Sequence, residues 1–229
     1  MKVKIICIFI MTLLIATALP AFGAIKTIGN DNSLPIQNGP VDQKQTTHCG
    51  TGTQLRPPFM SAQSFKPTKE NLTAVQIWLF KNHEPVPGIE ITVSIREALN
   101  GTDLTVKTIN ADDVGIEGTG TWVFFNFEDI TVIPEETYYI VCRGSYGSSL
   151  NNYCWLFDVD DKYTRGEAWF SNHNGAIWIT LWENYEYSPK WREPDYCFKT
   201  YFQQSKNKSI LNPFLNWLHT HPNLFPILR

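Results

Sequence analysis

Residues 120–142 constrain the fold more than any other part of this sequence. Two runs within them, 122–127 and 138–141, place apolar side chains on both faces of a strand. Because successive side chains of a strand point to opposite faces, such strands are expected to be covered on both sides, at the centre of a β fold. The acidic and proline-containing residues between them, 128–136, do not continue a central ladder easily and predict a corner.

Further short strands are predicted beside this pair, separated by turns rich in glycine, proline and asparagine. They are expected at residues 43–47, 62–65, 71–80, 91–96, 104–109, 153–158, 167–171, 176–182 and 196–202. No helical periodicity separates them, so a parallel α/β fold, which needs crossover helices, is disfavoured. The pattern predicts an all-β fold, a two-sheet antiparallel sandwich of jelly-roll type.

Residues 1–23 have the features of a signal peptide: a positively charged start, an apolar run of 15 residues at 5–19, and small residues at 21–23. The alternative is an uncleaved anchor, but a membrane span needs roughly 20 apolar residues. We therefore expect an exported protein, extracellular or in the cell envelope. Its parts would be a polar leader at 24–40, a β-sandwich domain at 41–203, and a hinge with an amphipathic helical tail at 204–229.

The tail has apolar residues at helical spacing, at positions 210, 211, 214, 215, 217 and 218, and Pro222 ends the predicted helix. It is too short and too interrupted to cross a bilayer. Three roles stay open for residues 210–228. They are docking on the sandwich, contact with a membrane interface, and a sorting or partner signal.

Four cysteines remain once a signal peptide carrying Cys7 is removed, and four cysteines allow three pairings. An exported protein meets oxidising conditions that favour disulfides. Cys142 and Cys154 flank a loop rich in glycine and serine, so they are the candidates for a bridge across a hairpin. The alternative is that Cys49, Cys142, Cys154 and Cys197 are small apolar residues with free thiols.

The charge and motif content argues against several function classes. A formal net charge of −3 without a basic stripe disfavours nucleic acid as a partner. The sequence has no H-E-x-x-H zinc spacing, no G-x-S-x-G nucleophile turn and no phosphate-binding glycine loop. A non-catalytic protein is therefore expected, and a hydrolase that brings distant acids together is the remaining enzyme alternative.

Asp158, Asp160 and Asp161 form the densest acidic cluster. Their carboxylates are candidate oxygen ligands for calcium, although the glycine and distal glutamate of an EF-hand loop are missing. The alternative is a solvated turn in which aspartates accept backbone hydrogen bonds. No cofactor is expected apart from this candidate structural calcium.

Aromatic residues concentrate between residues 155 and 191, where five of the eight tryptophans lie. In 177–182 the aliphatic side chains take one strand face, expected toward the core, and the tryptophans take the other with Thr180. The aromatic face is either a second buried layer or a platform for sugar rings or another surface ligand. The candidate ligand-binding residues are Trp178, Trp182, Tyr185, Tyr187 and Trp191.

Five short motifs carry a resemblance to a known family. They are residues 62–68 with 72–75 (AQSFKPT and LTAV), 93–96 (VSIR), 101–104 (GTDL), 130–132 with 137–141 (ITV and TYYIV) and 198–201 (FKTY). On these, residues 41–203 resemble a β-sandwich module of secreted and surface proteins of archaea and bacteria. That module is similar to carbohydrate-binding-like, galactose-binding-like jelly rolls. The resemblance implies a binding domain without catalytic residues and carries over no ligand-binding residue.

The function predicted from the sequence is an exported, non-catalytic β-sandwich that recognises carbohydrate or another cell-surface ligand. Its partner would be a glycan or a surface protein. The alternative is a structural or adhesion protein of the envelope without a small ligand, attached through its C-terminal tail.

Overall fold

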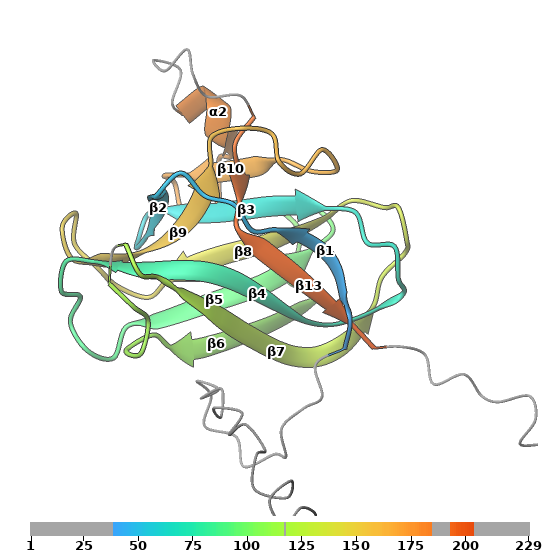
Figure 1. Cartoon of the computed structure of the whole chain (residues 1–229), viewed down its shortest axis with the longest axis horizontal. Helices are drawn as coiled ribbons and strands as arrows, with labels where there is room; N and C mark the ends of the chain where they lie inside the picture. Colours follow the sequence, from blue (N-terminus) through green and yellow to red (C-terminus); the bar gives the residue numbers. More distant parts are fainter. Residues whose placement is uncertain (1–38, 117, 185–192, 204–229) are drawn as a thin grey trace, which may run out of the picture.

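The described residues of the computed structural model, 39–116, 118–184 and 193–203, form two antiparallel sheets (Figure 1). This confirms the predicted all-β fold with two antiparallel sheets, and the jelly-roll type of strand connection stays a prediction. The predicted signal peptide (1–23), leader residues 24–38 and the tail (204–229) lie outside the described residues.

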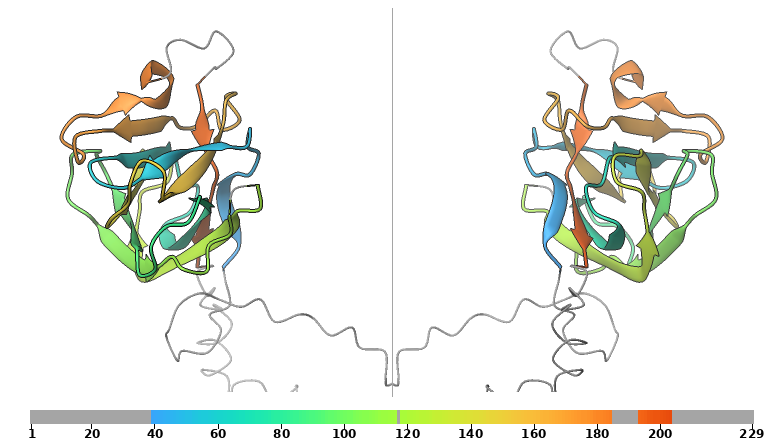
Figure 2. Two further views of the ribbon diagram at one scale, coloured as in Figure 1. Left: turned by 90° about the vertical axis from the view of Figure 1, so that its left-hand side faces the viewer. Right: turned by 90° about the vertical axis from the view of Figure 1, so that its right-hand side faces the viewer.

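Sheet A has seven strands: β1 (Val41–Gln45), β2 (Thr51–Leu55), β4 (Asn71–Asn82), β7 (Thr121–Thr131), β9 (Asn152–Asp158), β12 (Asp195–Tyr196) and β13 (Phe198–Phe202). The long strand β4 organises this sheet. One edge of β4 pairs with β7, and the other pairs first with β13 and then with β9. β1 and β13 lie side by side in every view (Figures 1 and 2).

Sheet B has six strands in the order β11-β10-β3-β8-β5-β6. These are β3 (Met60–Phe65), β5 (Glu90–Arg96), β6 (Thr105–Asn110), β8 (Tyr138–Gly144), β10 (Ala168–Ser171) and β11 (Ile179–Thr180). The short helix α2 (Leu181–Asn184) follows β11. It begins there because Thr180 and Glu183 each accept a hydrogen bond from the other's backbone N–H, which satisfies two donors of the first turn.

The two strands within residues 120–142 lie in different sheets. β7 belongs to sheet A, β8 belongs to sheet B, and the predicted corner carries the chain from one to the other. The backbone N–H of Ile133 donates to the hydroxyl of Tyr138 at this corner (3.0 Å). The expectation of two central strands holds for β8, which pairs with β3 and β5. It is wrong for β7, which pairs with β4 alone among the described strands and leaves Trp122 and Phe124 partly exposed.

The main core lies between the two sheets. Trp155 of β9 is fully buried there, and its ring stacks on Tyr196 with centroids 4.4 Å apart. The indole N–H of Trp155 donates to the carbonyl of Cys197 (2.9 Å), so the polar atom of this buried side chain has a partner. Trp155 is therefore a core residue, although it belongs to the aromatic cluster seen in the sequence.

Cys142 and Cys154 do not face each other across a hairpin. Cys142 lies on β8 in the core between the sheets, and Cys154 lies on β9 in a separate cluster with Phe80 and Leu156. The thiol of Cys154 donates to the side-chain oxygen of Asn152 (3.2 Å), and burial raises the pKa of the Cys142 thiol. The structure therefore does not form the predicted bridge.

Residues 176–182 form less strand than predicted. Only Ile179 and Thr180 pair with β10. Asn174 and Gly175 adopt positive φ angles, so the turn between the two strands occupies residues that were predicted to lie in the second strand. Leu181 is buried in the main core as expected. Ile177 is 56% exposed, so the expectation that it faces the core is wrong.

Candidate functional site

Trp178 is the predicted ligand-binding residue whose side chain the structure describes. It is partly buried and packs with Met60, Ala62 and Val141 on the outer face of sheet B, the face turned away from sheet A. Trp182 lies in α2, and Tyr185, Tyr187 and Trp191 lie outside the described residues. The structure therefore places the one candidate whose side chain it describes on the outer face of sheet B.

The middle of the outer face of sheet B is a row of small, fully buried side chains. Ala62 of β3 pairs with Val141 of β8, and Val141 pairs with Ser94 of β5. Larger side chains surround this row and pack against it. They are Met60, Leu99, Tyr139, Trp169 and Trp178. A second apolar cluster thus lies outside the main core, with two indole rings and one phenol ring partly open to solvent.

Sequence reasoning missed Trp169 and Tyr139 as members of this face. Both had a usable signal, since Tyr139 alternates with the core residues Tyr138 and Ile140, and Trp169 alternates with Ala168 and Phe170. Alternation shows only which side chains of one strand share a face. Tyr139 and Trp169 can be assigned to the same face of sheet B only when β3 is known to lie between β8 and β10.

Three nitrogen donors on this face are buried without a hydrogen-bond acceptor among the described residues. They are the indole Nε1 atoms of Trp169 and Trp178, and Nη1 of Arg143. A buried donor without an acceptor costs about 1–3 kcal/mol. These three atoms have almost no solvent-accessible surface, so a ligand oxygen does not reach them without movement of the neighbouring side chains.

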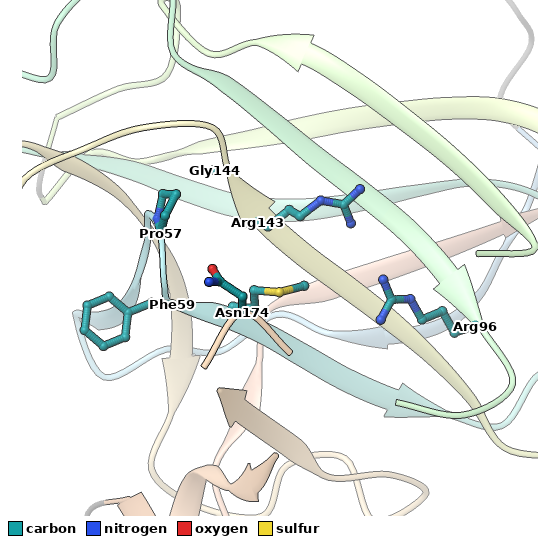
Figure 3. A pocket seen from close by; sticks show the side chains of 7 residues that line it. Pro57, Phe59, Arg96, Arg143, Gly144 and Asn174 are labelled. Carbon is teal, nitrogen blue, oxygen red and sulfur yellow. The ribbon is translucent and has the colours of Figure 1, made fainter. Parts of the chain in front are cut away.

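A cavity of about 250 Å³ opens at one end of this face (Figure 3). We call it the arginine cavity, and its lining includes Pro57, Phe59, Met60, Arg96, Arg143 and Asn174. Arg96 comes from β5 and Arg143 from β8. Asn174 comes from the turn after β10, which is tied to the β2–β3 connection because its backbone N–H donates to the carbonyl of Pro58 (2.8 Å).

Asp103 connects the two arginines of the cavity. Arg96 Nε lies 2.6 Å from Asp103 Oδ1, and Arg143 Nη2 lies 3.9 Å from Asp103 Oδ2. Burial raises the pKa of Asp103, but the hydrogen bond from Arg96 and the charges of both arginines outweigh it, so the pKa lies below its ordinary value. Asp103 is therefore an ionised bridge and a poor proton donor.

A second cavity of about 380 Å³ lies toward the other end of the face, and Tyr139 and Trp169 are part of its lining. Its lining includes the carboxylates of Asp161, Glu167 and Glu193. On β3, Met60 lines the arginine cavity and Ser64 lines the second cavity. The strand rises about 13 Å between these two residues. The outer face of sheet B thus connects a cavity lined by arginines with a cavity lined by several acids. The distance between the two cavities is long enough for more than one sugar ring.

The acidic cluster forms a turn in which the backbone N–H of Asp160 donates to Asp158 (3.1 Å) and Lys162 pairs with Asp160 (3.1 Å). Within residues 39–116, 118–184 and 193–203, no group of three or more His, Cys, Asp or Glu residues is placed to hold a metal ion. Asp158 is buried, whereas Asp160 and Asp161 are exposed, and calcium binding by these three residues stays a prediction.

A buried carboxylate beneath the second cavity was not found from the sequence. Asp195 of β12 accepts hydrogen bonds from the backbone N–H groups of Lys162 and Tyr163 (3.0 and 2.8 Å) and from Gln63 (3.0 Å). Burial raises the pKa of Asp195 to about 7, against the lowering effect of these bonds. Asp195 holds the loop between β9 and β10, several of whose residues line the second cavity.

No protein-family model matches this chain, and no curated protein matches it either. The two-sheet fold is compatible with the resemblance to a carbohydrate-binding-like module, and that resemblance stays a prediction. In the part of the chain that the structure describes, no helix is long and apolar enough to cross a membrane.

Proposed function

We propose that this protein is an exported, non-catalytic binding module that recognises carbohydrate through the outer face of sheet B. The observation that carries the proposal is the presence of two partly exposed tryptophan rings, Trp169 and Trp178, on one face. Indole rings pack on the apolar faces of sugar rings. The face therefore offers an aromatic surface on which a sugar ring can stack.

The two carboxyl groups near this face that have shifted pKa values, Asp103 and Asp195, favour binding over catalysis. A glycosidase needs two carboxyl groups across the scissile bond, one of them with a raised pKa as the proton donor. The pKa of Asp103 is instead lowered by Arg96 and Arg143. Asp195, whose pKa is raised, is 1% exposed and uses both oxygens on donors of the protein. Neither group has the position and the protonation state that the chemistry requires.

The substitution Trp169→Ala tests the proposal. The full-length protein is expected to bind at least one glycan on a panel of immobilised neutral and acidic glycans. Trp169→Ala should weaken this binding by about 30-fold, since a central aromatic contact is worth about 2 kcal/mol. Surface plasmon resonance measures both affinities.

The matched control is Trp122→Ala, which removes another partly exposed indole from the outer face of sheet A. It should leave glycan affinity within about twofold of the wild type. Equal losses in the two variants would mean that the effect is not specific to this site, and the assignment would be wrong.

A second candidate function is that of an adhesion or structural envelope protein, favoured by a cluster on the outer face of sheet A. The rings of His48 and Trp78 lie 4.6 Å apart, those of Trp78 and Trp122 lie 5.2 Å apart, and Lys199 Nζ lies 4.0 Å from the centre of the Trp122 ring. Aromatic residues are enriched at protein–protein contacts. The C-terminal tail would then attach the protein to the envelope.

Deletion of residues 204–229 tests this second candidate. If the tail attaches the protein, the truncated protein should move from the envelope fraction to the medium almost completely, as measured by immunoblotting of the two fractions. The Trp169→Ala variant should fractionate like the wild type. A truncated protein that stays in the envelope fraction would exclude attachment through the tail.

A further inference from the structure

The arginine cavity has an excess of positive charge. It brings together the guanidinium groups of Arg96 and Arg143, and Asp103 is the acid that contacts them both. Two positive charges and one negative charge leave a net charge of +1. This local excess contrasts with the formal charge of −3 of the whole chain.

Asp103 does not use all the hydrogen-bonding capacity of the arginines. Arg96 donates through Nε to Asp103 and through Nη1 to the carbonyl of Leu99 (2.9 Å). Arg143 Nη2 lies 3.9 Å from Asp103 Oδ2, beyond hydrogen-bond distance, and the side chain of Arg143 is partly exposed. Arg143 therefore has an accessible charged group whose hydrogen bonds Asp103 does not satisfy.

We propose that the glycan bound on this face is acidic, and that its carboxylate or sulfate group binds to Arg143 and Arg96 in the arginine cavity. This inference rests on the proposed carbohydrate-binding function and names the substrate class of the same site. The planar guanidinium fork matches a carboxylate or sulfate group, and it binds such a group with two parallel hydrogen bonds. The side chains of Arg96 and Arg143 are 14% and 36% exposed, so solvent screens the interaction only in part.

The size and walls of the cavity agree with one acidic sugar at the end of a longer chain. Its volume of about 250 Å³ lies below the roughly 300–1,000 Å³ of sites that enclose a whole drug-sized ligand. Met60 and Pro57 provide apolar wall for a sugar ring, while Arg143 and Arg96 provide the charge. The remaining sugars would extend over Trp169 and Trp178.

The distribution of charge on this face also determines the direction in which an acidic glycan binds. The second cavity, at the far end of the face, is lined by Asp161, Glu167 and Glu193. Lys66 and Arg165 line it too, and Arg165 is paired with Glu135. A carboxylate or sulfate is repelled by these acids and attracted by the arginines, so the charged end of the glycan belongs in the arginine cavity.

The test compares one glycan with and without its charge. The full-length protein is titrated by calorimetry with oligogalacturonate, with its methyl ester, which has the same rings without the carboxylates, and with a sulfated oligosaccharide. An acidic form should bind at least tenfold more tightly than the uncharged ester. Its affinity should fall as sodium chloride is raised, because the contact is ionic. Comparison of the titrations with oligogalacturonate and with the sulfated oligosaccharide identifies which anionic group the cavity binds.

Substitutions assign the charge effect to the cavity. Arg143→Gln should weaken binding of the acidic form at least tenfold and change binding of the ester less than twofold. The control Lys44→Gln removes an exposed positive charge from β1 of sheet A and should leave both affinities unchanged. Asp103→Asn, which keeps an acceptor for Arg96 but removes the negative charge, should strengthen binding of the acidic form several-fold. This gain cannot come from a folding defect.

Three outcomes would overturn the inference. The acid and the ester could bind equally, Arg143→Gln could leave the acidic form unaffected, or only uncharged glycans of the panel could bind. In each case the carbohydrate-binding function would survive if Trp169→Ala still weakened binding by about 30-fold. A protein that binds no glycan of the panel would instead contradict the proposed function itself.

Discussion

The free energy of unfolding of this protein is expected to fall by about 2–3 kcal/mol between pH 5 and pH 8 through Asp195 alone. The folded-state pKa of this carboxyl group is about 7, above the roughly 3.9 of an unfolded chain. Between these two values the folded state holds the proton and the unfolded state releases it. Stability is therefore highest below the unfolded pKa and is lost as the pH rises toward 7.

The cause of this pH dependence is the position of Asp195 between the sheets. Its side chain is 1% exposed, so its ionised form is poorly solvated, and the charge of Asp161 raises the pKa further. Three N–H donors, from Gln63, Lys162 and Tyr163, compensate only in part. The stability of the β9–β10 loop, and with it the second cavity, is therefore linked to pH.

The variant Asp195→Asn isolates this contribution. It cannot ionise, so its free energy of unfolding should change by about 2–3 kcal/mol less than that of the wild type between pH 5 and pH 8. Urea unfolding followed by tryptophan fluorescence at several pH values measures the two curves. The other titrating groups are common to both proteins and cancel in the difference. Parallel curves for the two proteins would show that Asp195 titrates at an ordinary pKa.

The burial of Asp195 could not be predicted from the sequence. The residue stands in a polar stretch, Glu193 to Tyr196, and its fully buried position depends on β12 pairing with β9. Alternation along one strand predicts which side chains share a face, but not which strands are neighbours. The sandwich with two antiparallel sheets could therefore be predicted from the sequence, because it requires only strand periodicity and the absence of helical patterns.

The candidate site could be predicted only in part, for the same reason. The sequence identified residues 155–191 as rich in tryptophan and placed Trp178 on the face opposite Leu181, as the structure has it. The arginine cavity could not be predicted. Arg96 and Arg143 are 47 positions apart and meet because β5 and β8 are neighbours in sheet B. Asp103, which joins them, comes from the connection between β5 and β6.

Tryptophans of the same cluster are expected to respond very differently to substitution. Trp155→Ala should lower the free energy of unfolding by about 3–5 kcal/mol, the range found when a large aromatic residue is removed from a core. Trp155 is fully buried, stacks on Tyr196 and donates its indole N–H to Cys197. Trp169 is partly exposed and its N–H has no acceptor among the described residues, so Trp169→Ala should cost much less, about 1 kcal/mol.

Urea unfolding of the two alanine variants at one pH measures this difference. The intermediate variant Trp155→Phe keeps an aromatic ring in the core and loses the indole N–H, and should cost about 1–2 kcal/mol. Since a domain of this kind is stable by only about 5–15 kcal/mol, Trp155→Ala should remove a large fraction of its stability. Similar losses for Trp155→Ala and Trp169→Ala would mean that Trp169 is a core residue. The outer face of sheet B would then be a second packed layer, without the spare aromatic surface that glycan binding requires.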